Sequence, residues 1–342
     1  MTKIQAAIVG ASGYSGEELV RLLLRHPNCE LKIITSRQHD GQHIEEVFPR
    51  FAGHNLKFSA PDVKRIAAEC DVAFLALPHG LAAEFAKPLV EAGVVAIDIS
   101  ADFRIKNTAK YKEYYKTDHP APDMLARAVY GLPERYRKQI AQADLIACPG
   151  CYPTSSILPT APLLAAKLAL PEDIIISSMS GVTGAGRKVD LAYLFPECNE
   201  SLRAYAPVKH RHLPEIEQEL AAAAGMPEVA INFVPHLVPV NRGINSTIFL
   251  KVAPGCTLDK ITAAYHDAYA AEPFVRVLAP GKQADTKYVI MTNVCEISYT
   301  LDEHTGRVIA TSAIDNLTKG ASGQAVQCMN IRFGNCETDG LL

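Results

Sequence analysis

Short apolar runs alternate with helical patterns through the first 150 residues of the chain. Residues 4–9 predict a strand, and residues 17–25, in which Leu and Val side chains form a broad apolar face, predict a helix. Further strands are predicted at residues 31–35, 72–77 and 94–99. Because continuous apolar runs separated by helices indicate strands buried on both faces, this half of the chain predicts a parallel sheet of βα units.

The pattern changes after about residue 155, where strands follow one another with few helices between them. The main helical patterns are at 215–224 and 258–271, and the turn residues at 303–306 predict a hairpin. This half therefore predicts an α+β domain on a largely antiparallel sheet, followed by a helix at 319–333. The predicted strands are at 174–178, 230–234, 246–252, 274–278, 289–299 and 308–314.

Composition and charge narrow the class of protein. A length of 342 residues suggests about two domains, and a hydrophobic fraction of 48% excludes a disordered chain. The formal net charge of −3 gives no electrostatic reason to expect nucleic acid or an anionic membrane as a partner. The apolar runs are too short to span a bilayer, and no signal-peptide pattern precedes the first strand. Nine cysteines without framework spacing favour reduced thiols, so we expect a cytoplasmic protein.

A glycine-rich turn follows the first predicted strand directly. Gly10, Gly13 and Gly16 are spaced G-x-x-G-x-x-G between that strand and a predicted helix. In this context a tight turn lets backbone N–H groups approach a pyrophosphate at the helix N-terminus, where the dipole also favours anions. The turn therefore predicts a Rossmann-type dinucleotide-binding domain, with an ordinary glycine turn as the alternative.

The end of the second predicted strand bears on which dinucleotide binds. An NAD site usually has a carboxylate here for the ribose hydroxyls, whereas this chain has Thr35, Ser36 and Arg37 and no acid before Asp40. Hydroxyls and a guanidinium suit a 2′-phosphate, which favours NADP. The alternative is that Arg37 is an ordinary solvated surface residue.

One cysteine stands at a position suited to chemistry. Cys151 leads into a segment of helical character at 155–168, although Pro159 and Pro162 restrict where that helix begins. A thiolate near a helix N-terminus has a lowered pKa, which a nucleophile needs near neutral pH. Cys148 and Cys151 also form a C-x-x-C pair, so metal or disulfide chemistry stays open. No second such pair exists, and we expect no metal.

Two imidazoles lie close together in the string Lys209-His210-Arg211-His212-Leu-Pro214. They share one face if the stretch is extended, and Pro214 can open the helix that follows. A His beside a Cys can serve as general base and acid. A His-x-His pair could also ligate a metal, but no third ligand is evident.

Other strings follow predicted strands or carry small and polar residues. Pro78 and His79 lie at the carboxyl end of a strand, and the segment from Ser100 to Arg104 follows the strand at 94–99. That edge is where ligands bind in open α/β sheets. The glycine- and hydroxyl-rich segments 180–187 and 315–324 could close on a cofactor or be flexible loops.

Together these strings resemble the N-acetyl-gamma-glutamyl-phosphate reductase family of the semialdehyde dehydrogenase superfamily. The resemblance spans nearly the whole chain, and the length is similar to the shorter, single-function bacterial form. Ser155 departs from the Gly or Ala that the family usually has after the Thr, which is a change from one small residue to another. The strings that carry the resemblance are 10–16, 100–104, 149–154, 180–187, 210–216 and 315–324.

The resemblance implies an activity and a domain arrangement. The activity is NADPH-dependent reduction of N-acetyl-L-glutamyl 5-phosphate to the 5-semialdehyde, with release of phosphate, in arginine biosynthesis. The implied arrangement is a Rossmann-type NADP-binding domain at 1–150, completed by a C-terminal helix at 315–342, and a catalytic, substrate-binding and oligomerisation domain at 151–314. A homo-oligomer, dimer or tetramer, would be built through the sheet of the second domain.

The resemblance also assigns roles to residues. By position in the family's strings, Cys151 is the nucleophile that forms a thioester, and His210 is the acid/base. His212 is the second candidate for the acid/base and otherwise a substrate contact. The predicted substrate contacts are His212, Arg211, Arg187, Ser100 and Arg104. The predicted NADP contacts are Gly10, Ser12, Gly13, Tyr14, Ser15, Gly16, Ser36, Arg37, Pro78, Ser180, Gly181, Gly184 and Asn316.

Two other functions stay open at this point. A related reductase could act on the acyl phosphate that is one carbon longer, in lysine biosynthesis through aminoadipate. A non-catalytic NADP-binding regulator would need the glycine turn but would have no use for an activated Cys beside a His pair. An aspartate-semialdehyde dehydrogenase is disfavoured, because its cysteine string differs from Pro-Gly-Cys-Tyr-Pro-Thr.

Overall fold

The computed structural model describes residues 3–342, which divide into two compact units. The first unit comprises Met1–Thr108, Thr117–Pro149 and Ala321–Leu342, and the second comprises Ala109–Lys116 and Gly150–Gly320. Among the helices of residues 3–342, none combines the length and the apolar character needed to cross a membrane.

The first unit is built on one sheet of seven parallel strands. The predicted strands at its centre are confirmed, with ends that shift by one or two residues, and their side chains are almost all buried. The strands are β1 (Ile4–Val9), β2 (Cys29–Thr35), β3 (Phe58–Ser59), β4 (Val72–Leu75), β5 (Val95–Asp98), β6 (Val129–Tyr130) and β7 (Leu145–Ala147).

The strand order in this sheet is β3-β2-β1-β4-β5-β7-β6. From β1 the chain proceeds outward through β2 and β3, and then returns to β4 and proceeds the other way. The carboxyl ends of β1 and β4 therefore flank the topological switch point, which is where open α/β sheets bind their ligands. The predicted parallel α/β architecture of the N-terminal half is confirmed.

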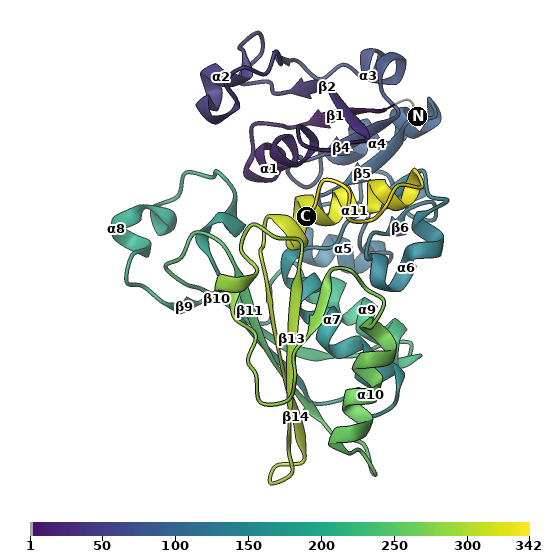
Figure 1. Ribbon diagram of the computed structural model, residues 1–342, viewed down its shortest axis with the longest axis vertical. Helices are drawn as coiled ribbons and strands as arrows, with labels where there is room; N and C mark the ends of the chain where they lie inside the picture. The colour runs from purple at the N-terminus through teal and green to yellow at the C-terminus, as the bar shows by residue number, and fades with distance from the viewer. Residues whose placement is uncertain (1–2) are drawn as a thin grey trace. The chain divides into compact units, whose positions relative to one another are not determined.

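Helices connect these strands and cover the sheet. The helix predicted at 17–25 begins earlier, at Tyr14, because Gly13 has the extended backbone of an N-cap. The last helix of the chain packs against the first helix, the sixth helix and β5 (Figure 1). The helices of this unit are α1 (Tyr14–Leu23), α2 (Ile44–Val47), α3 (Val63–Glu69), α4 (Ala82–Glu91), α6 (Pro133–Ile140) and α11 (Gly323–Arg332).

The second unit is built on a mixed sheet, in the order β12-β13-β14-β11-β8-β10-β9. Four of its six strand pairings are antiparallel, so the predicted largely antiparallel sheet is confirmed. The hairpin predicted at 303–306 joins β13 to β14, which are antiparallel neighbours in this sheet. The strands are β8 (Ile174–Ser180), β9 (Arg203–Ala204), β10 (Ile231–Leu237), β11 (Ile244–Lys251), β12 (Val275–Val277), β13 (Cys295–Asp302) and β14 (Arg307–Ile314).

The helices of the second unit lie mainly on one face of this sheet. The seventh helix packs against β11 and β14, and the ninth and tenth pack beside it (Figure 1). The opposite face is only half covered, so that Ile175 and Met179 of β8 are exposed. The helices are α5 (Thr108–Tyr115), α7 (Cys151–Ala165), α8 (Phe195–Cys198), α9 (Leu213–Ala224) and α10 (Leu258–Tyr269).

Two further elements start later than expected. The strand predicted at 289–299 starts only at Cys295, because Met291 adopts a left-handed backbone and its N–H bonds to the Asp315 carboxylate instead of a neighbouring strand. The helix predicted at 319–333 starts at Gly323, because a π-helical turn over Thr318–Ser322 precedes it.

Helix α7 begins before the predicted segment 155–168, and it contains both prolines. A proline inside a helix removes one N–H, and so leaves the carbonyl four residues earlier without its usual donor. Here the Ser312 hydroxyl donates to the carbonyl of Ser155 at 2.5 Å, and the Tyr269 hydroxyl donates to the carbonyl of Leu158 at 2.6 Å. Side chains of the second unit thus replace the donors that Pro159 and Pro162 lack, and α7 continues back to Cys151.

Candidate active site

Cys151 is the first residue of α7, and Gly150 is the N-cap. The sequence-based expectation of a cysteine near a helix N-terminus is confirmed, with the helix starting at the cysteine itself. The thiol is partly exposed. Because the first N–H groups of a helix lack intrahelical partners and carry the positive end of the dipole, this position favours the thiolate.

A buried carboxylate that sequence reasoning missed holds the backbone just before the cysteine. The N–H of Gly150 donates to Oε1 of Glu215 at 2.9 Å, and Glu215 is fully buried. Glu215 lies in the first turn of α9, whose N-cap is His212. The bond therefore joins the N-terminus of α7, where Cys151 lies, to the first turn of α9, which the His pair directly precedes. The string 210–216 contained this residue, but nothing in its spacing indicated a partner 65 positions away.

Aromatic rings surround His210. Its ring centroid lies 5.3 Å from that of Tyr152, 5.5 Å from those of Tyr205 and Phe233, and 4.9 Å from that of His212. The hydroxyls of Tyr152 and Tyr205 share a hydrogen bond of 2.8 Å. Burial lowers the pKa of His210 from 6.5 to about 4, and the neighbouring Arg211 adds to the effect. The imidazole is therefore neutral near pH 7.

A backbone contact selects the tautomer of this imidazole. The N–H of His212 donates to Nδ1 of His210 at 3.1 Å. Since Nδ1 accepts, a neutral ring carries its proton on Nε2. His210 can therefore offer an N–H to an oxygen that gains negative charge, as neutral imidazoles do in other enzymes.

Arg211 and Arg187 are both exposed residues of the second unit. The guanidinium of Arg211 lies 5.8 Å from the ring centroid of Tyr115, a cation–π distance. Arg187 follows a short 3₁₀ turn at Val182–Ala185. Both cations can meet an anionic group, and Arg211 is adjacent in sequence to both predicted histidines.

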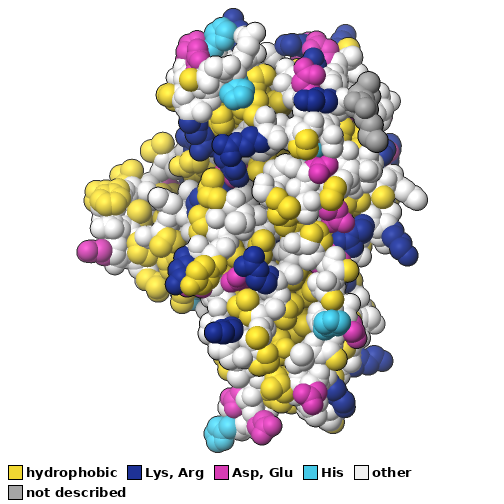
Figure 2. Space-filling model, viewed as in Figure 1, with side chains coloured by type: hydrophobic (Ala, Val, Ile, Leu, Met, Phe, Trp, Pro, Cys, Tyr) yellow, Lys and Arg dark blue, Asp and Glu magenta, His cyan; other side chains and the backbone are white. Residues whose placement is uncertain are grey.

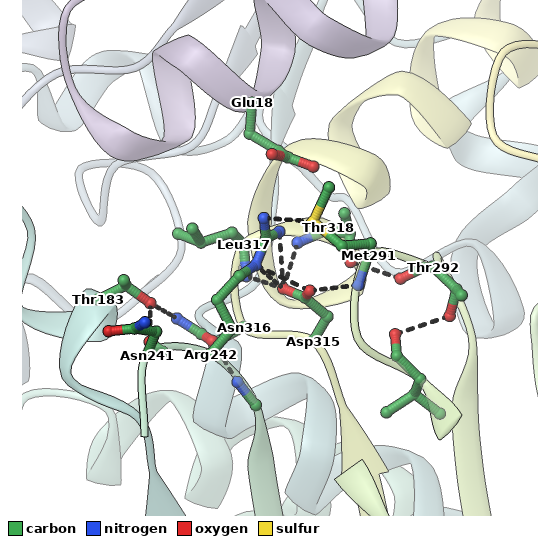
Figure 3. A network of polar contacts seen from close by, with 12 residues as sticks. Glu18, Thr183, Asn241, Arg242, Met291, Thr292, Asp315, Asn316, Leu317 and Thr318 are labelled. Atoms are coloured by element: carbon green, nitrogen blue, oxygen red, sulfur yellow. Dashed lines mark hydrogen bonds and ion pairs between the residues drawn. The ribbon is translucent and has the colours of Figure 1, made fainter. Parts of the chain in front are cut away.

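Asn316 lies in a dense polar network of the second unit (Figure 3). Its Oδ1 accepts from the N–H of Gly243 at 2.8 Å, and its Nδ2 donates to the Thr183 hydroxyl at 3.0 Å. Beside it, the buried Asp315 forms an ion pair of 2.9 Å with Arg242. The Asn316 amide therefore bonds both the segment before β11 and, through Thr183, the loop that carries Gly181 and Gly184, and it helps to hold that loop in place.

Gly320 gives Cys151 the room it occupies. A Cβ on Gly320 would lie 2.8 Å from Cβ of Cys151 and 3.2 Å from its Cα. Both distances are below ordinary carbon–carbon contact, so only glycine fits here without a shift. Sequence reasoning singled out the string 315–324, but not this approach to the nucleophile.

The glycine turn of the first unit is tightly built. Gly10 has φ +93°, and a Cβ on it would lie 2.4 Å from the carbonyl oxygen of Ala76. A Cβ on Gly16 would lie 2.4 Å from the carbonyl oxygen of Gly10. No side chain caps α1, whose N-cap is Gly13. Because glycine has no side chain, the backbone N–H groups of this turn stay open to a ligand. Such N–H groups at a helix N-terminus fit the pyrophosphate of a dinucleotide.

The other predicted contacts of the first unit divide by burial. The Ser12 and Ser36 hydroxyls lie 3.0 Å apart, and Arg37 beside them is exposed. Pro78 is exposed as well, whereas Ser100 and Arg104 are buried. The structure therefore brings Cys151, His210, His212 and Arg211 together in the second unit. It gathers the contacts predicted at 10–16, 36–37 and 78 at the carboxyl edge of the sheet in the first.

Two of the other thiols are too buried to act as nucleophiles. All nine cysteines are free, and burial raises the pKa of Cys29 and Cys70 to about 12, so both stay protonated. Within residues 3–342, no three His, Cys, Asp or Glu side chains are grouped so that they could hold a metal ion.

Two family profiles match the chain in succession. Residues 5–143 match the semialdehyde dehydrogenase NAD binding domain, and residues 151–316 match the semialdehyde dehydrogenase dimerisation domain. Among solved structures, aspartate semialdehyde dehydrogenase II of Vibrio cholerae superposes with a TM-score of 0.73 at 17% identity, over 98% of this chain and 99% of that one. This likeness shows the shared fold.

Relatives of known name are much more similar in sequence. N-acetyl-gamma-glutamyl-phosphate reductase of Akkermansia muciniphila is 53% identical, over 100% of this chain and 99% of the relative. The reductase of the same name from Syntrophobacter fumaroxidans is 49% identical, over 99% of this chain and 98% of the relative. At this identity and coverage, the chain belongs to the N-acetyl-gamma-glutamyl-phosphate reductase family of the semialdehyde dehydrogenases.

Proposed function

We propose that the chain reduces N-acetyl-L-glutamyl 5-phosphate to N-acetyl-L-glutamate 5-semialdehyde with NADPH, in arginine biosynthesis. The relatives that match it along its full length carry that reductase name. The observation that carries the chemistry is Cys151 at the first position of α7, with the ring of the next residue, Tyr152, against the half-buried His210. A reactive thiol at a helix N-terminus has a use in acyl transfer that a regulator would not need.

Cys151 opens the reaction by attacking the acyl carbon. Its sulfur forms a C–S bond, the C–O bond to phosphate breaks, and the phosphate leaves with that electron pair. The acyl group is then held as a thioester at a fixed place. NADPH, when bound, supplies the hydride that reduces this thioester. Collapse of the resulting tetrahedral centre breaks the C–S bond, releases the aldehyde and returns the thiolate, so that one difficult step becomes two easier ones.

His210 acts on the oxygen that gains charge in both half-reactions. Each tetrahedral centre carries an oxyanion, and an Nε2–H aimed at it lowers the barrier without a full proton transfer. The tautomer set by the His212 N–H supports this role. The general acid/base role expected for His210 stays a prediction. The geometry supports one part of it, which is that Nε2–H can donate a hydrogen bond.

Arginine side chains and a helix N-terminus bind the anionic groups of the substrate and the cofactor. Arg211 and Arg187 of the second unit meet the acyl phosphate or the substrate carboxylate, and His212 directly follows Arg211 in the chain. In the first unit, the uncapped N-terminus of α1 receives the pyrophosphate. Ser36 and the exposed Arg37 suit the 2′-phosphate, and the end of β2 offers no carboxylate for an NAD ribose.

The test is turnover of defined acyl phosphates by purified enzyme, followed through the loss of NADPH absorbance. We expect N-acetyl-L-glutamyl 5-phosphate to be turned over, and Cys151→Ala to lower kcat by at least about a thousandfold. Cys256→Ser, at another partly exposed cysteine of the same unit, is the matched control and keeps wild-type turnover. Without NADPH, the acyl adduct should accumulate on Cys151 and show by mass spectrometry.

Three outcomes would overturn parts of this proposal. Higher kcat/KM for the acyl phosphate one methylene longer would assign the enzyme to the aminoadipate route instead. A Cys151→Ala enzyme with near wild-type turnover would remove the covalent route. Tight NADPH binding with no turnover of either substrate would support a regulator.

We also propose that the chain forms a homodimer through its second unit. The half-exposed face of the sheet and an apolar stretch around α8 support this. Val189 is 91% exposed and Phe195 is 75% exposed, and Figure 2 shows hydrophobic side chains gathered over α8. Sedimentation equilibrium tests the proposal, and a monomer at micromolar concentration would refute it. The cytoplasmic location stays a prediction.

A further inference from the structure

A buried carboxylate in the first unit collects backbone donors from another segment. Asp102 is fully buried, and its Oδ1 accepts from the N–H of Gly80 at 2.6 Å. Its Oδ2 accepts from the N–H groups of Ala82 and Ala83 at 3.0 Å and 3.3 Å. The N-cap of α4 is Leu81, which makes no capping hydrogen bond with its side chain. Asp102 therefore caps α4 from 20 residues away, where a negative charge is also favoured by the helix dipole.

The segment that Asp102 holds borders the predicted dinucleotide site. Residues 76–81 connect β4 to α4, and β4 is the strand beside β1 at the topological switch point. The two segments touch there, since a Cβ on Gly10 would lie 2.4 Å from the Ala76 oxygen and 3.1 Å from Cδ2 of Leu77. The glycine turn and residues 76–81 thus form the two sides of the place where a dinucleotide would bind, and Asp102 fastens one of them.

A short chain of hydrogen bonds supports Asp102 in turn. The N–H of Ser100 donates to Oδ1 of Asp98 at 2.8 Å, and the N–H of Asp102 donates to Oγ of Ser100 at 3.2 Å. Burial, together with the charge of Asp102, raises the pKa of Asp98. Asp102, by contrast, meets three backbone N–H donors, which is the environment that suits a carboxylate acceptor. Ser100, a predicted substrate contact, serves this chain.

We propose that Asp102 is a positioning residue for the dinucleotide. It holds residues 76–81 in the conformation that accepts the cofactor, and it does so through backbone N–H groups of Gly80, Ala82 and Ala83. The proposal rests on the NADPH site of the proposed function and adds a residue outside the predicted contacts. This role does not require a charged group of the cofactor next to Asp102, because the carboxylate is buried and its hydrogen-bond donors are protein N–H groups.

The test is direct NADPH binding, measured by the fluorescence of the reduced nicotinamide without any acyl substrate. In Asp102→Asn one acceptor oxygen becomes an NH₂ group that faces N–H donors, so the segment loses at least one fastening bond. We expect the Kd for NADPH to rise at least about tenfold, equivalent to about 1.4 kcal/mol. The KM for NADPH should rise in parallel, while the KM for the acyl phosphate, and kcat at saturating NADPH, stay within about threefold.

A matched control and a milder variant complete the design. Asp123→Asn removes an exposed carboxylate that pairs with Lys87 of the same helix α4 at 2.7 Å, and it should leave the Kd unchanged. Ser100→Ala removes the hydroxyl that orients the Asp102 N–H, and it should raise the Kd by a smaller factor. This variant decides the matter if Asp102→Asn does not fold. An unchanged Kd in both variants overturns the inference alone, whereas a wild-type enzyme that binds no NADPH overturns the proposed function with it.

Discussion

Substitution of Gly320 by alanine tests how closely Cys151 is positioned. The new Cβ would lie 2.8 Å from Cβ of Cys151, whereas carbon atoms in contact prefer about 3.5–4.0 Å. The two backbones must therefore separate by roughly 1 Å. The backbone itself presents no obstacle, because Gly320 does not have the positive φ that disfavours other residues.

The surroundings decide which side gives way. The turn before Gly320 is fixed by Asp315, whose carboxylate accepts from the Met291 N–H at 2.7 Å and pairs with Arg242 (Figure 3). The Gly320 N–H also donates to the Asp315 carbonyl at 2.9 Å. Because this side is held by several bonds, we expect the displacement to fall on Cys151 and the first turn of α7.

The magnitude follows from two general costs. Overpacking a filled site destabilises a protein by about 1–3 kcal/mol. Misplacing a reacting group by about 1 Å can lower the rate by about a hundredfold. We therefore expect Gly320→Ala to fold with a lowered melting temperature and to lose about ten- to a hundredfold in kcat/KM.

Three measurements separate the explanations. Steady-state kinetics give kcat/KM, mass spectrometry gives the rate of Cys151 alkylation by iodoacetamide, and calorimetry gives the melting temperature. The Kd for NADPH is measured alongside and shows whether the cofactor site is displaced as well, because Asn316 of the same turn is a predicted NADP contact. A variant that keeps kcat/KM and the alkylation rate within about threefold of wild type would refute the reasoning.

Three further substitutions test the electrostatics. Tyr205→Ala opens the aromatic surroundings of His210, so the pKa of His210 should rise from about 4 toward 6.5. An NMR titration of the His210 Cε1–H measures this pKa, and an unchanged midpoint would contradict the prediction. The neutral form of Asp98, whose pKa is raised from 3.8 to about 7, stabilises the fold below pH 4, and this stability is lost as the pH rises through 7. Asp98→Asn should therefore gain melting temperature relative to wild type between pH 5 and pH 8 in calorimetry, and parallel pH curves would contradict it. Arg37→Ala should raise the KM for NADPH much more than the KM for NADH, and an equal change in both would separate Arg37 from the 2′-phosphate.

Local patterns were enough to predict most of the first unit. The strand at Ile4–Val9, the glycine turn and the helix after it follow from neighbouring residues alone, because burial on both faces and the need for φ > 0 at Gly10 act over a few positions. The same holds for Cys151, whose place before a helical segment was visible in the sequence. What these features share is a cause that lies within one turn or one strand.

Errors arose where the decisive partner is distant in sequence. The strand predicted at 289–299 fails because Asp315 takes the Met291 N–H. The start of α7 was obscured by two prolines, whose missing donors are replaced by Ser312 and Tyr269. In each case the local pattern was read correctly, but a side chain more than 20 positions away satisfies the backbone differently.

Side chains distant in sequence also bond the N-termini of two helices, which sequence rules for capping do not detect. Sequence rules look for Ser, Thr, Asp or Asn just before a helix, and α1, α4 and α7 have Gly13, Leu81 and Gly150 there, with no capping side chain. The buried Asp102 supplies the missing acceptor to α4, and the buried Glu215 bonds the Gly150 N–H at the start of α7. The N-cap of α1, Gly13, also makes no capping bond with a side chain, and α1 is the helix that follows the glycine turn. We therefore expect a phosphate of the cofactor to be the acceptor there, in the position that carboxylates occupy at α4 and α7.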